Sequence, residues 1–395
     1  MDLLESIIKR DKEFLIGSYA PQNIAFVSGD GCKLFDTSGR EYIDFLAAIA
    51  VNSLGHKHPV FINALMDQVN RIVASSNLYY NEYRGLLAER LTEGTTLKKV
   101  FFCNSGAEAN ECAIKLVRKY FFERGKNKFK FITAAHSFHG RTLTTVSATG
   151  QEKYSKPFAP LPPGFGSYIR YNDIEAMKKA LEDDEVGALM LEPILGEGGV
   201  IPATSEYLRA CREETSKRGI LLILDEVQTG GGRTGTFWAC IKHGIMPDIL
   251  TAAKGIGGGL PIGACLTTEE VAQAFKPGDH GNTFGGSPLV CAVALAVVSK
   301  IRQPEFMQNI KTVGEYFKRE LRGLASSHIV DVRGDGLMLG IELNPDLSAK
   351  TVVTSMLEKG FVINACGDNV LRFLPPLIIE KCHIDAMLNA LKTLI

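Results

Sequence analysis

The chain has 395 residues, and its 44 basic and 44 acidic side chains give a formal net charge of zero. Hydrophobic residues make up 45% and charged residues 22%, which is ordinary for a globular protein with a large core. A neutral chain has no whole-molecule field to attract nucleic acid or an acidic membrane, although a local basic groove stays possible.

The nine cysteines are scattered, and no pair has the C-x-x-C spacing of a structural zinc site. They favour buried thiols in a reducing compartment over a disulfide framework. The N-terminal residues do not have the layout of a signal peptide, and the longest apolar run, 289–298, is too short to span a bilayer. We therefore expect a soluble, cytoplasmic protein.

The predicted elements change in character along the chain. Residues 24–45 predict short strands broken by glycine-containing turns, and the region from about 99 to 266 alternates apolar strands with amphipathic helices. The strands of this region are predicted at 100–103, 129–134, 187–191, 220–224 and 262–266, all buried on both faces, with helices at 107–122 and 205–217. This alternation is typical of a mainly parallel sheet covered by helices.

After Pro304 the pattern becomes that of a mixed α+β unit. A long helix to 324 precedes further strands and helices, predicted at 329–333, 337–343, 350–358, 361–363, 370–373 and 384–394. We expect an α/β protein with a large domain over 46–300 and a small α+β domain. The small domain would combine an N-terminal segment, 1–45, with the C-terminal residues 301–395.

Two residues at strand ends carry the chemistry that the sequence indicates most clearly. Lys254 ends an apolar strand and opens a glycine-rich loop, and the small residues around it leave no bulk near its ammonium group. A lysine that forms an imine needs desolvation, which lowers its pKa, and room for a flat carbonyl cofactor. Asp225 ends the strand 220–224, where parallel sheets bind ligands. Its carboxylate could cap a helix, bind a metal or pair with a cationic ring nitrogen.

Two loops offer further ligand contacts. In the segment 104–110, which joins a strand to a helix, Ser105 and the free N–H groups of the helix start suit a phosphate. Ser105 would serve equally well as an ordinary helix cap. In the segment 137–142, Phe138 could stack on a flat ligand and Arg141 could bind a carboxylate with two hydrogen bonds.

A second anion-binding candidate is Arg372, which lies in an apolar stretch and needs an acidic partner, for which Glu197 is plausible. The segment 230–235 satisfies G-x-G-x-x-G, but it does not follow its strand directly and opens no clear helix, so it does not indicate a dinucleotide site. The histidines at 56–58 and 136–139 lack further ligands, so we expect no metal.

These motifs, in this order, resemble the class III (subgroup II) pyridoxal-phosphate aminotransferases, and among them most closely the acetylornithine aminotransferases. The resemblance extends from Tyr42-Ile43-Asp44 and the motif at 54–59 to Pro375-Pro376. It implies a fold-type-I enzyme, whose large pyridoxal-phosphate-binding domain holds a mainly parallel, seven-stranded type of sheet beside a small α+β domain. It also implies a homodimer with active sites at the subunit interface.

The resemblance further implies how the cofactor, pyridoxal 5'-phosphate, is bound. Lys254 matches the lysine that forms an imine with it, and Asp225 matches the acid under its pyridine nitrogen. Ser105, Gly106 and Ala107 match the loop that binds the phosphate. Phe138 and Val227 match the contacts on the two faces of the ring, and Gln228 matches the contact to its phenolic oxygen. Thr283 matches a phosphate ligand from the neighbouring subunit.

For the substrates, Arg141 matches the arginine that binds the α-carboxylate of acetylornithine. Arg372 matches the arginine for the α-carboxylate of glutamate and 2-oxoglutarate, and Glu197 matches the glutamate that masks it. Asn282 stands where relatives often have Ser or Thr near the substrate. Tyr19 lies near a position that tunes recognition of the ω-amine.

The closest resemblance therefore implies transfer of the ω-amino group of N-acetylornithine to 2-oxoglutarate, as in arginine biosynthesis. Succinyldiaminopimelate, ornithine and 4-aminobutyrate aminotransferases are alternatives that the sequence does not separate. Glutamate-semialdehyde aminomutase is a more distant alternative. A non-catalytic binding protein of the same fold is disfavoured, because Lys254, Asp225 and both arginines are present.

Overall fold

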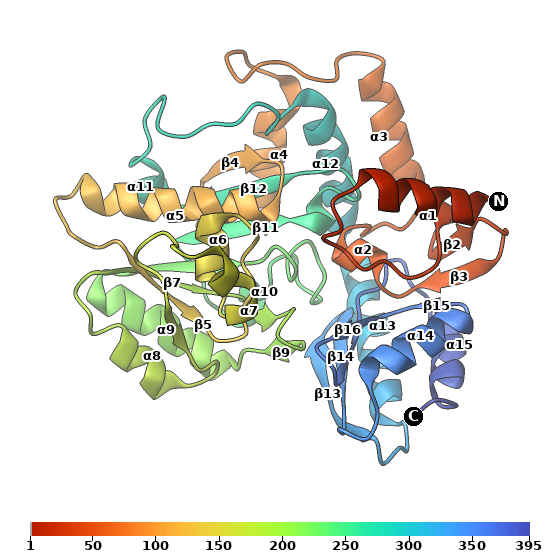
Figure 1. The fold of residues 1–395 in the computed structure, drawn as a ribbon. Coiled ribbons are helices and arrows are strands. Elements are labelled where there is room, and N and C mark those ends of the chain that lie inside the picture. Colours follow the sequence, from red (N-terminus) through yellow and green to blue (C-terminus); the bar gives the residue numbers. More distant parts are fainter. Residues whose placement is uncertain (1) are drawn as a thin grey trace.

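The computed structural model describes residues 2–395, which form a large sheet between helices and a smaller part assembled from both chain ends (Figure 1). The strands of the large sheet lie in the order β4-β12-β11-β10-β7-β5-β6. Their bounds are β4 Lys99–Cys103, β5 Lys130–Ala134, β6 Ser167–Ile169, β7 Val186–Leu191, β10 Leu221–Asp225, β11 Ile249–Ala253 and β12 Gly263–Thr267. Only β12 runs antiparallel to its neighbours, so the prediction of a mainly parallel, seven-stranded sheet is confirmed.

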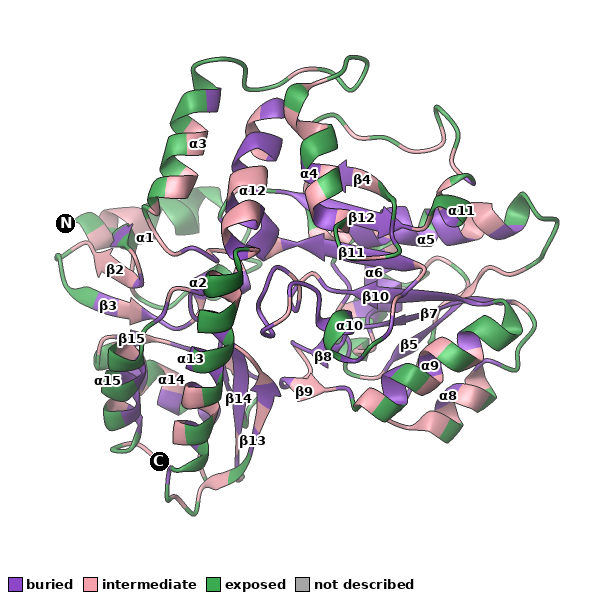
Figure 2. Cartoon of the chain, turned by 180° about the vertical axis from the view of Figure 1, so that it is seen from behind, coloured by how far each residue is buried: buried purple, intermediate pink, exposed green. Residues whose placement is uncertain are grey.

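Alternate side chains of the central strands pack on opposite faces of this sheet, as the two-residue period of a strand requires. Leu221 and Ile223 of β10 belong to the apolar cluster under α5, Gly106–Phe122. Leu222 and Leu224 belong to the cluster that includes the buried face of α9 (Ser205–Arg218). Figure 2 shows the sheet as a buried layer between helices whose outer faces are exposed.

The remaining helices of the first 301 residues surround this core or lie at its rim. Several begin at a capping side chain, as α9 does where Thr204 accepts a hydrogen bond from the Tyr207 N–H. Their bounds, with two 3-10 turns and one small hairpin, are α1 Leu3–Phe14, α2 Ala47–Ala50, α3 Pro59–Val69, α4 Glu82–Thr92, α6 Leu143–Ala148, α7 Glu152–Ser155, η1 Lys156–Phe158, α8 Ile174–Ala180, β8 Ile194–Leu195, β9 Ile201–Pro202, α10 Ala239–Lys242, η2 Lys254–Ile256, α11 Glu269–Ala272 and α12 Pro288–Ile301.

The smaller part contains two four-stranded sheets. One has the order β13-β14-β17-β16 and the other the order β1-β2-β3-β15, so the N-terminal strands pair with a C-terminal one. The bounds are β1 Phe26–Asp30, β2 Lys33–Asp36, β3 Glu41–Asp44, α13 Pro304–Arg322, β13 Ile329–Asp335, β14 Met338–Leu343, α14 Ala349–Glu358, β15 Phe361–Val362, β16 Asn364–Cys366, β17 Val370–Phe373 and α15 Lys381–Leu391. The domain boundaries near 45 and 300 stay predictions.

Three details differ from the sequence-based expectations. Strand β4 lies at the edge of its sheet and is not fully buried, and the short strand β6 was not expected at all. Eight of the nine cysteines are buried, but Cys382 is exposed at the start of α15. Within residues 2–395, no helix is both long and apolar enough to cross a membrane.

The element α2 is a strained turn, not a regular helix. Its residues Ala47, Ala48, Ile49 and Ala50 have φ values of 47°, 52°, 63° and 65°. This left-handed conformation costs roughly 1–2 kcal/mol for each residue with a side chain. The next residue, Val51, lines the cavity described below, so the strain is stored beside it.

Candidate active site

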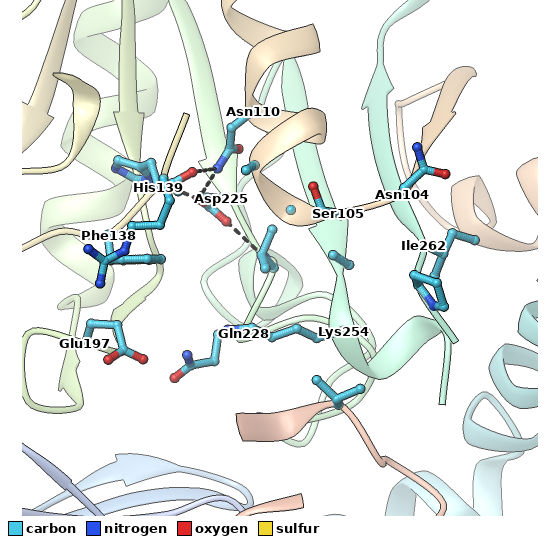
Figure 3. Close-up of a pocket in the computed structure, with 18 of the residues that line it drawn as sticks. Asn104, Ser105, Asn110, Phe138, His139, Glu197, Asp225, Gln228, Lys254 and Ile262 are labelled. Atoms are coloured by element: carbon cyan, nitrogen blue, oxygen red, sulfur yellow. Dashed lines mark hydrogen bonds and ion pairs between the residues drawn. The ribbon is translucent and has the colours of Figure 1, made fainter. Parts of the chain in front are cut away.

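A cavity of about 440 Å³ opens where three neighbouring strands of the large sheet end (Figure 3). Glu192 follows the end of β7, Asp225 ends β10, and Lys254 follows β11, and all three line the cavity. The carboxyl ends of parallel strands meet at one edge of a sheet, which explains why residues so distant in sequence come together. The strand-end reasoning for Asp225 and Lys254 is therefore consistent with their positions.

The carboxylate of Asp225 is fixed by its neighbours. One of its oxygens is 2.8 Å from both the side-chain amide nitrogen of Asn110 and Nδ1 of His139, and the other accepts the Val227 N–H at 3.0 Å. Thr251 donates to the opposite end of the Asn110 amide at 2.7 Å. Asp225 is 4% exposed, so these bonds hold the carboxylate in one orientation at the cavity wall. A buried carboxylate held in this way can pair with a cationic ring nitrogen.

The N-terminus of α5 reaches the same cavity and suits a phosphate. Gly106 and Ala107 are the first residues of the helix, so their N–H groups have no acceptor inside it, and both line the cavity. Ser105 is the N-cap and accepts a hydrogen bond from the Glu108 N–H at 3.1 Å. A Cβ at Gly106 would lie 2.7 Å from a methyl group of Val227, so only glycine allows this close approach.

Lys254 lies opposite this helix start, partly exposed to the cavity and with a φ of +49°. Burial lowers the pKa of Lys254, and Arg372 lowers it further, although the carboxylates of Glu197 and Asp225 oppose both effects. A lysine with a lowered pKa has a larger neutral fraction, which is the form that attacks a carbonyl or accepts a proton.

Phe138 and Val227 complete a set of residues that fits pyridoxal phosphate. Both side chains line the cavity, as does Gln228, together with an amine, a carboxylate and a helix N-terminus. These groups match the aldehyde, the ring nitrogen and the phosphate of that cofactor. The chemistry of the donor set therefore fits it.

Arg372 is only 1% exposed and does not line the cavity itself, but it contacts the lining residues Glu197 and Gln228. Its Nη1 is 2.6 Å from Oε1 of Glu197 and also donates to the Gly196 carbonyl, and its Nη2 donates to the Asn364 side chain at 2.7 Å. Burial would raise the pKa of Glu197, but Arg372 and Lys254 outweigh it and hold that pKa below its usual value. Glu197 is thus an anion paired with Arg372, and it is the acidic partner expected for this arginine from the sequence.

Arg141 lies at the mouth of the cavity and is exposed. Its guanidinium carbon is 3.9 Å from the ring centroid of Tyr154 and 5.3 Å from that of Phe138. The two rings restrict the arginine without neutralising it, so its charge stays available for an anion.

Besides Arg372, three predicted site residues do not line this cavity. Thr283 and Tyr19 are exposed, Tyr19 to 89%. The side chain of Asn282 donates to the Phe102 carbonyl of β4 at 2.9 Å and accepts the Gly285 N–H of its own loop. The expected substrate contact of Asn282 stays a prediction.

The structure also adds residues that the sequence analysis did not select. Asn110 and His139 orient Asp225, Tyr154 packs on Arg141, and Asn364 holds Arg372. Burial raises the pKa of Glu192, the carboxylate between these groups, to about 7, with His139 opposing the shift. Glu192 follows a buried strand as Asp225 does, so the same strand-end signal could have identified it.

Comparisons with known proteins agree with this geometry. The family model "Aminotransferase class-III" matches residues 17–395. An acetylornithine aminotransferase of Caldanaerobacter subterraneus subsp. tengcongensis is 48% identical, with 98% of each chain covered. The structure of an ornithine aminotransferase from Toxoplasma gondii, reported with PLP at its active site, has a TM-score of 0.95 at 33% identity and covers 99% of this chain and 94% of its own.

An N-acetylornithine aminotransferase structure from Stenotrophomonas maltophilia has a TM-score of 0.85 at 35% identity, covering 98% of this chain and 97% of its own. The similarity is therefore not confined to the cavity and extends over both the large sheet and the smaller part. The chain belongs to the class III aminotransferases, the pyridoxal-phosphate-dependent transaminases whose cofactor the cavity fits.

Proposed function

We propose that this protein transfers the ω-amino group of N-acetylornithine to 2-oxoglutarate, giving N-acetylglutamate semialdehyde and glutamate. The observation that carries the proposal is a pair of arginines, one that lines the cavity and one that lies behind the lining residue Glu197. Arg141 is exposed at the mouth, whereas Arg372 is buried and paired with Glu197. Two of the three relatives described above are named for acetylornithine, which supports the same donor here and a place in arginine biosynthesis.

The two substrates differ in where their carboxylate lies relative to the reacting amine. In N-acetylornithine the α-carboxylate is far from the ω-amine, and Arg141 at the mouth would bind it with two hydrogen bonds. In glutamate the α-carboxylate is adjacent to the amine, so the inner Arg372 would bind it after Glu197 moves aside. Glu197 would neutralise Arg372 while the first substrate is bound, which prevents an unpaired buried cation.

When bound, pyridoxal phosphate supplies an electron sink for the carbanion that forms at the amine-bearing carbon. Asp225, held by Asn110 and His139, would keep the ring nitrogen protonated. The amine of Lys254 would take the proton from the substrate carbon and move it to the cofactor side, which its lowered pKa favours. Phe138 and Val227 would fix the ring plane, Gln228 would contact its phenolic oxygen, and Ser105, Gly106 and Ala107 would bind the phosphate.

We further propose a cytoplasmic homodimer, in which Thr283 reaches the phosphate of the neighbouring subunit and Asn282 and Tyr19 approach its substrate. The support is a set of large apolar side chains that a single chain leaves exposed. Leu78, Tyr80 and Phe284 are 86%, 100% and 68% exposed, and Phe284 is the neighbour of Thr283. Apolar exposure of this kind marks an interaction surface.

The test is a spectrum of the purified holoenzyme before and after addition of N-acetylornithine without any keto acid. We expect the absorbance of the lysine-bound cofactor to give way to that of its amine form. Equal or better conversion with ornithine would instead favour ornithine aminotransferase activity, as the Toxoplasma relative is named. The kcat/KM values for N-acetylornithine, ornithine, succinyldiaminopimelate and 4-aminobutyrate decide which amine is the preferred donor. Absence of any cofactor band after added pyridoxal phosphate would overturn the proposal.

A further inference from the structure

A second cavity, of about 480 Å³, lies against the C-terminal half of α5. Figure 1 shows this end of the helix at the outer edge of the large sheet, where the chain leaves α5 for β5. The helix has 17 residues and is therefore roughly 25 Å long, which separates this cavity from the phosphate-binding N-terminus of the same helix.

The wall of this second cavity is strongly basic although the whole chain is neutral. Its single carboxylate, Asp279, lies 3.1 Å from Lys119, which also pairs with Glu123. The cationic side chains that line it are Lys115, Arg118, Lys119, Lys126 and Lys128. Cations in the last turn of a helix stabilise its dipole, which accounts for Lys119. It does not account for Lys126 and Lys128, which follow the end of the helix.

Two of these cations are partly buried without an acidic partner in contact. The Nε of Arg118 is buried and has no hydrogen-bond partner within residues 2–395, and its Nη2 donates to the Pro163 carbonyl. Lys128 donates to the Arg218 carbonyl at 3.2 Å. Burial lowers the pKa of Arg118, although Glu111 opposes this, and burial together with Lys126 lowers the pKa of Lys128. A bound anion would compensate these charges.

An aromatic ring stands beside the cations. Phe122 lines the cavity and is 78% exposed, so most of its ring faces solvent. An exposed ring next to lysines offers a stacking face for a flat base.

We propose that this cavity is a second ligand site, separate from the catalytic one, which binds a small molecule carrying a pyrophosphate group. The lysines and Arg118 would contact the phosphate oxygens. Inorganic pyrophosphate and a nucleoside diphosphate share this chemistry, and the ring of Phe122 distinguishes them.

The test is calorimetric titration of the holoenzyme, whose catalytic phosphate site is filled, with pyrophosphate and with ADP. The double variant Lys126→Ala/Lys128→Ala is expected to bind both about tenfold more weakly, because two charge-assisted contacts are lost. The exposed Lys392, at the far C-terminus, provides the matched control, and Lys392→Ala should bind as the unmodified protein does. If the ligand is a nucleotide, Phe122→Ala should weaken the binding of ADP but not that of pyrophosphate. If the ligand is the inorganic anion, Phe122→Ala should weaken the binding of neither compound.

Binding should also weaken as salt rises, because the contacts are largely solvent-exposed. The transamination rate should stay unchanged in all three variants, which shows that they fold and separates this proposal from the proposed activity. Two results would overturn the second site: no detectable binding of either anion to the holoenzyme, or equal affinities in the lysine double variant and the Lys392 control.

Discussion

Replacing Glu197 by Gln tests whether this carboxylate controls which substrate the site prefers. The substitution keeps the shape and a hydrogen-bond acceptor for Arg372 but removes the negative charge 2.6 Å from its Nη1. A hydrogen bond between charged groups contributes roughly 1.5–3 kcal/mol, about twice a neutral one, so the lost charge is worth about 1.5 kcal/mol. Glutamate no longer has to displace that interaction, so its kcat/KM should rise by about tenfold.

The kcat/KM for N-acetylornithine should fall in the same variant, because Arg372 stays unneutralised while that substrate is bound. The assay is the rate of each half-reaction, followed in single turnovers with each amine. A matched control is Glu342→Gln, which removes the carboxylate paired with Arg333 in the smaller part, outside the cavity. The hypothesis that Glu197 masks Arg372 is wrong if the ratio of the kcat/KM values for glutamate and N-acetylornithine changes by less than twofold. It is also wrong if this ratio changes by as much in Glu342→Gln as in Glu197→Gln.

Three further substitutions test other parts of the argument. Asp225→Asn should keep the cofactor bound but lower turnover by at least about a hundredfold, since the ring nitrogen loses its anionic partner; near-normal turnover would contradict that role. Burial raises the pKa of Glu226 to about 7 from 4.5, so its contribution to stability is complete below pH 4.5 and is lost as pH rises to about 7. The loss is about 3 kcal/mol at most, and Glu226→Gln should therefore flatten the fall in urea midpoint between pH 5 and pH 8 relative to the unmodified protein; identical profiles would refute this. Ala48→Gly should raise the free energy of unfolding by about 1 kcal/mol, because glycine tolerates the left-handed φ of 52°, whereas Ala386→Gly in the regular helix α15 should lower it by a similar amount. Equal urea midpoints for the two glycine variants would argue against strain at α2.

The sheet could be predicted because its strands are buried on both faces and therefore appear as continuous apolar runs. Two features of the sheet are not predicted by these apolar runs. Strand β6, Ser167–Ile169, is a short edge strand with an exposed residue, so its sequence differs little from a loop. The antiparallel direction of β12 depends on how the chain returns to the sheet, which the hydrophobic pattern of a strand does not encode.

The same distinction applies to the residues that we propose to be catalytic. Asp225 and Lys254 follow apolar strands, so their place at the sheet edge follows from local sequence and the rule for parallel sheets. Asn110 lies in the first turns of α5 and His139 in a loop, and only the packing of α5 against the sheet brings both to Asp225. No spacing in the sequence predicts such contacts.

The position of Arg372 shows most clearly how the site depends on strand pairing. Asn364 and Arg372 are directly opposite each other in the antiparallel pair β16–β17, which is why the amide oxygen reaches Nη2. The register of this pair is set by the short connection 367–369, where Gly367 has a φ of +67° that favours glycine. Side chains alternate between the faces of a strand, so a shift by one residue would turn Arg372 away from both Asn364 and Glu197. The sequence motif therefore identifies the charged residue, but the turn at Gly367 determines whether its guanidinium reaches Asn364 and Glu197.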